Sequence, residues 1–108
     1  MGDDYRASEI RVLSLAGQLL AGQLGVIAAA RALASLRHDA QPELSEILLV
    51  FTAIASETDD LPVGEVRQHW STEALERKDR EIAEAEEFYR DSAVKAATRL
   101  VRLLEFLQ

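Results

Sequence analysis

Apolar side chains recur at intervals of three and four residues along almost the whole chain, and this spacing constrains the fold most. Residues three or four positions apart return to the same side of an α-helix, so each such run predicts a helix with one buried face. Alanine, leucine and glutamate, which all favour helices, are the commonest residues, and only two prolines occur. The sequence therefore predicts an all-α fold, and 108 residues match the size of one domain over residues 1–108.

Three main helices are expected, two of them long and one short. The first covers about residues 5–37, the second residues 42–56, and the third residues 71–107. Pro42 suits the first position of a helix, because the amide that proline lacks would have no partner there. An acidic segment with proline and glycine, residues 57–70, has the composition of a loop and joins the second helix to the third.

The lengths of these helices predict a homodimer. At about 1.5 Å per residue, the two long helices extend roughly 45–55 Å and the short one only about 22 Å. The first helix is apolar on nearly all sides and includes the uncharged run Val12–Ala30. One short helix cannot cover that surface, so we expect a second copy of the chain to complete the helical bundle. Alternatively, the third helix bends and folds back over its own chain.

The same uncharged run allows a second alternative, a membrane-associated small helical protein. Its 19 residues are close to the length that spans a bilayer. Against this interpretation, the run contains Ser14, Gln18 and Gln23 and has an arginine at each edge rather than a basic flank on one side. A helix buried in a bundle explains the run with less strain, so we expect no membrane contact.

Charge and missing residue types narrow the possible functions. The net charge of −7 opposes binding to nucleic acid, which requires clustered lysine and arginine. Residues 38–71 hold seven acids and one arginine and so carry −6 of that charge. The chain has no cysteine, which excludes disulfides and thiolate chemistry and is consistent with a reducing cytoplasm.

The loop 57–70 is the most unusual part of the sequence. It combines acids with the single tryptophan, a histidine and an arginine, and an aromatic residue ringed by charge is typical of a protein-binding surface. We therefore predict a non-enzymatic binding or assembly protein with a basic protein as its partner. By analogy with immunity proteins and antitoxins, it would inhibit a basic toxin. The candidate binding residues are Glu57, Asp59, Asp60, Arg67, His69 and Trp70.

A purely structural interpretation of this loop also stays open. In that interpretation Trp70 closes the end of the bundle. Arg67 then pairs with an acid of the same loop, either Glu57 or Asp59.

Two pairs of carboxylates give an alternative, enzymatic interpretation. They are Glu43-x-x-Glu46 and Glu76-x-x-Asp79. Acids three positions apart share a helix face, and two such pairs together can hold Mg²⁺ through oxygen ligands. The pattern resembles the E-x-x-E and E-x-x-D pairs of the all-α nucleotide pyrophosphatases of the MazG and dUTPase type, which are dimeric helical bundles. The resemblance implies Mg²⁺-dependent hydrolysis at these four residues, whereas a binding protein needs no cofactor.

Overall fold

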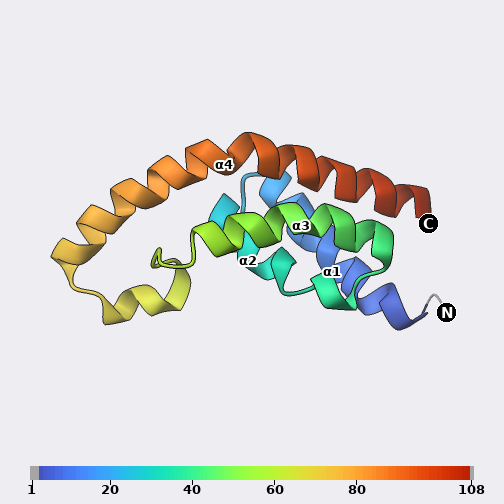
Figure 1. Ribbon diagram of the computed structural model, residues 1–108, viewed down its shortest axis with the longest axis horizontal. Coiled ribbons are helices and arrows are strands. Elements are labelled where there is room, and N and C mark those ends of the chain that lie inside the picture. Colours follow the sequence, from blue (N-terminus) through green and yellow to red (C-terminus); the bar gives the residue numbers. More distant parts are fainter. Residues whose placement is uncertain (1–2, 108) are drawn as a thin grey trace.

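The computed structural model describes the backbone of residues 3–107 and the side chains of residues 5–107. Within this part of the chain all regular structure is helical, as the sequence predicts. The elements are α1 (Asp3–Leu20), α2 (Val26–Ala34), α3 (Pro42–Glu57) and α4 (Thr72–Leu107), with the short 3₁₀ helices η1 (Arg37–Asp39) and η2 (Gly64–His69) (Figure 1).

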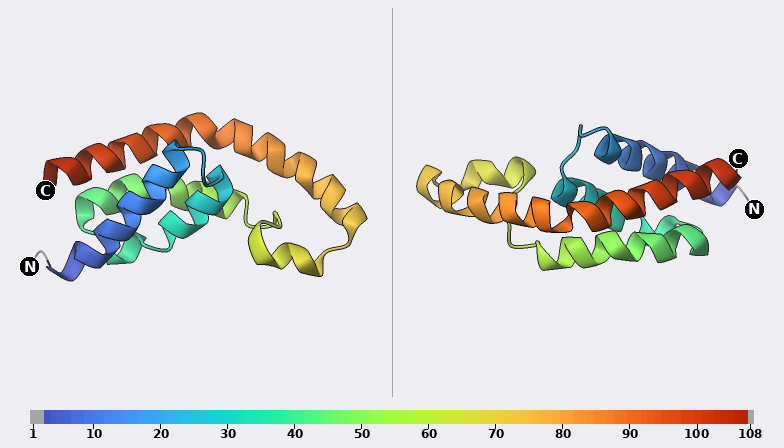
Figure 2. Two further views of the ribbon diagram at one scale, coloured as in Figure 1. Left: turned by 180° about the vertical axis from the view of Figure 1, so that it is seen from behind. Right: turned by 90° about the horizontal axis from the view of Figure 1, so that it is seen from above.

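The long helix α4 runs along one side of the other three helices. Its C-terminal half packs on α1 and α3, while its N-terminal half extends past the bundle and leads back to η2 (Figures 1 and 2). The molecule is therefore elongated, measuring 50 × 24 × 21 Å. α4 is one continuous, gently curved helix, so it packs over the other helices of its own chain without the expected bend (Figure 1).

A single apolar core lies between the four α-helices. Its largest completely buried side chain is Phe51 of α3. Removing such a side chain from water stabilises the fold by roughly 1.5–3 kcal/mol. α4 contributes mainly the small residues Ala93, Ala96 and Ala97, which let it approach the neighbouring helices closely. Other core residues are Val12, Leu15, Leu19, Leu33, Leu44, Leu48, Leu100 and Leu104.

The prediction of one continuous first helix over residues 5–37 is wrong. α1 ends at Leu20, and Gly22 then takes a φ of +75°, in the left-handed region that favours glycine. The amide of Gln23 donates to the carbonyl of Gln18 at 2.9 Å, and the amide of Gly22 donates to the carbonyl of Leu19 at 3.1 Å. These two hydrogen bonds form a Schellman motif, which terminates a helix.

This break weakens the reasoning that led to a homodimer. Because the chain turns at Gly22, α1 and α2 pack against each other and against the remaining helices. Apolar residues on both sides of the turn, such as Leu19 and Val26, are buried within one chain. The other two main helices match the predicted ranges 42–56 and 71–107 to within one residue.

Glu86 of α4 holds the start of α2. Its two carboxylate oxygens accept hydrogen bonds from the amides of Val26 at 2.7 Å and Ile27 at 2.8 Å. The residue before the helix, Gly25, has no side chain to cap these amides, so a carboxylate 60 positions further along the chain does so. A Cβ atom at Gly25 would lie only 3.1 Å from Glu86 Oε1, which explains why a glycine fits there.

Candidate protein-binding site

The loop that follows α3 is fixed to the bundle by polar contacts. Thr58 is buried, and its hydroxyl donates to the carbonyl of Ile54 at 2.7 Å. Arg31 of α2 donates to the carbonyls of Thr58 at 2.6 Å and Leu61 at 2.8 Å. The carbonyl of Thr58 also accepts a hydrogen bond from the amide of Leu61 at 3.1 Å, so the guanidinium group adds a charged donor to a turn that is already closed. Residues 58–61 are thereby held in one place.

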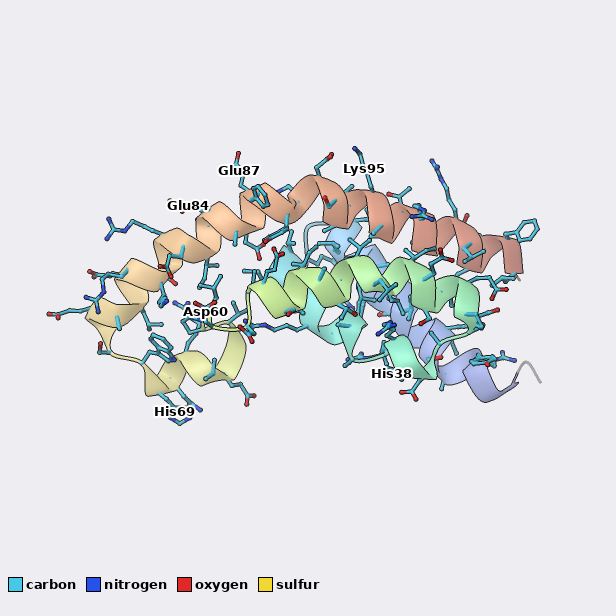
Figure 3. All side chains as sticks on the ribbon, viewed as in Figure 1. His38, Asp60, His69, Glu84, Glu87 and Lys95 are labelled. Carbon is cyan, nitrogen blue, oxygen red and sulfur yellow. The ribbon has the colours of Figure 1, made fainter. Side chains whose placement is uncertain are left out.

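This loop faces the middle of α4 across an open hollow of about 440 Å³. Asp60 lies on the loop side of the hollow and Glu84 on the α4 side (Figure 3). The hollow combines four carboxylates with two aromatic rings, and we call it the acidic hollow. Its defining residues are Glu57, Asp60, Glu81, Glu84, Phe88 and Tyr89.

The two aromatic residues differ in their contacts. Phe88 is 76% exposed, whereas Tyr89 is half-buried against the core. Their rings meet edge to face, with centroids 4.8 Å apart and an interplanar angle of 89°. The hydroxyl of Tyr89 donates a hydrogen bond to Glu57 Oε2, which ties α4 to the end of α3. This hydrogen bond, together with burial and the negative charge, raises the pKa of Tyr89 above its ordinary value of 10.0.

Besides Arg31, which donates to the carbonyls of Thr58 and Leu61, a lysine lies beside these carboxylates. The amine of Lys78 is 3.0 Å from Glu81 Oε2 and 3.7 Å from Asp60 Oδ2. The hydrogen bond to Glu81 and the charges of both acids raise the pKa of Lys78. Glu84 makes no ion pair with any residue that the structure describes, so the acidic hollow keeps unbalanced negative charge.

The six residues proposed from the loop 57–70 do not form one surface. Glu57 and Asp60 line the acidic hollow, whereas Asp59 is exposed outside its lining. His69 is exposed at the end of η2 (Figure 3), and Trp70, which follows it, is half-buried.

Arg67 belongs to a separate cluster of contacts near the start of α4. Its guanidinium donates to Asp79 through two nitrogens, at 2.6 and 3.1 Å, and to the carbonyl of Pro62 at 3.1 Å. The hydrogen bond with Arg67 lowers the pKa of Asp79. The expectation that Arg67 pairs with Glu57 or Asp59 is therefore wrong, because its partner lies on α4.

Only residues of the loop 57–70 were proposed from the sequence as a binding surface, so the contribution of α4 to the acidic hollow was missed. A signal was nevertheless present. Glu81, Glu84 and Phe88 are spaced three and four positions apart and so share one side of a helix. An aromatic residue on an otherwise acidic face is the pattern that indicates this surface.

The two carboxylate pairs proposed for Mg²⁺ lie far apart in one chain. Glu43 and Glu46 are at the start of α3, and Glu76 and Asp79 are at the start of α4, at the opposite end of the elongated molecule (Figure 1). Asp79 is also engaged by Arg67. Among the described residues, no group of three or more His, Asp or Glu side chains is arranged to hold a metal ion.

The uncharged run Val12–Ala30 is divided between α1 and α2 by the turn at Gly22. Within residues 3–107, none of the helices has both the length and the apolar character needed to cross a bilayer. Comparison with protein-family models, with curated proteins and with solved structures finds no match for this chain. The fold and the site together define a small protein that is helical throughout its described regular structure and has an open acidic and aromatic hollow.

Proposed function

We propose that this chain is a binding protein whose acidic hollow receives a basic segment of a partner protein. The observation that carries the proposal is that four carboxylates and the exposed ring of Phe88 meet at one concave place. Carboxylates bind lysine and arginine through charge-assisted hydrogen bonds, and an aromatic face attracts the same cations. Inhibition of a basic toxin is one role that such a surface would serve.

The exposure of Phe88 supports a partner rather than a purely solvated helix face. Burying a phenylalanine side chain stabilises a complex by roughly 1.5–3 kcal/mol, and this gain is unused while the ring stays 76% exposed. The neighbouring carboxylates repel one another, and a cation between them relieves that repulsion. Both effects favour a ligand that carries positive charge beside an apolar surface.

The proposal can be tested by fluorescence anisotropy with a labelled peptide rich in arginine and leucine. The protein should bind this peptide and should not bind the version in which glutamine replaces every arginine. Phe88→Ala should weaken binding about tenfold, because an aromatic anchor and its cation–π contact are lost. Glu84→Gln should weaken it about fivefold, because one charge partner is lost.

A matched control is Glu87→Gln, which removes the same charge one turn from Glu84. Glu87 is exposed and lies on the outer side of α4, away from the acidic hollow (Figure 3). Glu87→Gln should change the affinity for the peptide less than about twofold, because it alters only the net charge of the protein. Equal losses for Glu84→Gln and Glu87→Gln, or no binding of the arginine peptide by the unchanged protein, would contradict the proposal.

A further inference from the structure

We infer that the acidic hollow is built for an arginine side chain, and that Lys78 is an internal competitor that this arginine displaces from Asp60 and Glu81. The inference rests on the proposed function and names the chemistry of the ligand and its regulation by the chain itself. It follows from the position of one ammonium group relative to the carboxylates and the exposed aromatic ring.

Lys78 bridges the two walls of the acidic hollow at one end. Its contact with Glu81 stays within α4, three positions along the helix, whereas its contact with Asp60 crosses to the loop after α3. The crossing distance of 3.7 Å is longer than a normal hydrogen bond, and the lysine side chain is still 27% exposed. Its two acids are 69% and 54% exposed, and ion pairs with such solvated partners contribute little to folding, so Lys78 can leave without disrupting the fold.

Lys78 cannot satisfy the other end of the acidic hollow. Phe88 lies ten positions further along α4, which corresponds to about 15 Å at the rise of an α-helix. Among the described contacts, Glu57 accepts the hydrogen bond from Tyr89, and Glu84 has no cationic partner. One end of the hollow is therefore occupied by an ammonium group, and the other end offers a carboxylate and an aromatic ring.

Arginine fits this arrangement better than lysine does. A guanidinium group is planar and carries five N–H donors, so it can stack on a ring and donate to carboxylates on two sides at once. A lysine ammonium is a compact, strongly hydrated charge without a flat face. An entering arginine can donate to Asp60 and Glu81 in place of Lys78, while the segment that carries it contacts Phe88 beside Glu84.

The test compares two substitutions that remove the same charge from α4. Lys78→Gln removes the competitor, whereas Lys95→Gln removes an exposed lysine whose amine is 2.9 Å from Asp91 and which points away from the bundle (Figure 3). Binding is followed by anisotropy with the labelled arginine and leucine peptide and with the same peptide carrying lysine for arginine. Circular dichroism checks that each variant keeps its helical content.

We expect Lys78→Gln to bind the arginine peptide about fivefold more tightly than Lys95→Gln does, because only the first frees carboxylates of the hollow. Lys78→Arg should weaken binding, because arginine is the stronger competitor. The arginine peptide should bind more tightly than the lysine peptide. Equal affinities for Lys78→Gln and Lys95→Gln, or for the two peptides, overturn this inference while leaving the proposed function intact. If the unchanged protein binds neither peptide, the proposed function fails as well.

Discussion

Polar side chains that reach from one helix to another position the elements of this molecule. Glu86 caps α2 from α4, and Arg31 of α2 caps the end of α3. Neither contact could be predicted from the sequence, because the rules for helix capping concern residues within a few positions of the helix end. In the sequence Glu86 is one acid among several on a polar helix, and Arg31 marks only the edge of an uncharged run.

Replacement of Glu86 should destabilise the fold more than replacement of its neighbour. Glu86→Ala should lower the free energy of unfolding by about 2 kcal/mol, because two helix amides lose a charged acceptor. Glu86→Gln should cost less, because its amide oxygen can still accept one of the hydrogen bonds. Urea unfolding followed by circular dichroism measures both. Glu87→Ala is the control because Glu87 is exposed, and equal midpoints for the two alanine variants would show that the cap contributes nothing.

Tyr89 should titrate above the ordinary tyrosine pKa of 10.0. Its hydrogen bond to Glu57 favours the neutral phenol, so this contribution to stability is full below pH 10.0 and is lost as the pH rises through the folded-state pKa. Phenolate absorbance in a Tyr5→Phe background isolates the group, since the chain has two tyrosines. Glu57→Gln should lower the pKa of Tyr89. A Tyr89 pKa that does not respond to this change would contradict the contact.

At the scale of elements, prediction succeeded where the sequence carries local signals and failed where a glycine had two possible roles. Pro42 marked the start of α3, and the apolar spacing of the third helix marked α4. The first predicted helix, over about residues 5–37, ran through both Gly17 and Gly22. Gly17 does lie within α1, whereas Gly22 ends it, and only its positive φ separates the two. The apolar spacing continues across this turn because α1 and α2 each bury an apolar face.

The two glycines should respond in opposite ways to alanine. Gly17→Ala should raise the free energy of unfolding by about 1 kcal/mol, since alanine favours helix and no described atom lies within 4 Å of the added Cβ beyond the helix itself. Gly22→Ala should lower it by about 1 kcal/mol, because alanine is strained at a φ of +75°. Thermal or urea unfolding measures both changes. Stabilisation by both substitutions would mean that α1 continues through Gly22.

At the scale of the whole molecule, the homodimer remains a proposal that now rests on a smaller surface. The start of α1 and the end of α4 lie at the same end of the molecule (Figures 1 and 2). Apolar side chains are exposed in these two helices, with Ile10 61% exposed and Phe106 84% exposed. A twofold contact between copies would cover them.

Light scattering over a range of concentrations tests the dimer. The mass should rise from the 12.0 kDa of one chain toward twice that value as concentration increases. Phe106→Ser should shift the increase in mass to higher protein concentrations, whereas Lys95→Gln should leave it unchanged. A mass that stays at 12.0 kDa throughout would rule out self-association in that range.

The acidic hollow forms only in the folded molecule, so only part of it could be predicted from the sequence. Glu57 and Asp60 were proposed because they lie in an acidic loop that is evident in the sequence. Their partners, Glu81 and Phe88, come from α4, which returns past the loop only after the chain reverses between η2 and α4 (Figure 1). The spacing of residues along the sequence cannot show that the loop after α3 and the middle of α4 lie side by side.

The most direct test of the acidic hollow is a map of amide chemical shifts by nuclear magnetic resonance as the arginine and leucine peptide is added. Residues 57–61 and 81–89 should show the largest changes, since they form the two walls of the hollow. Phe88→Ala should reduce the changes along both walls. Changes centred on Glu43 and Glu46, or on η2, with the two walls unaffected, would contradict the account.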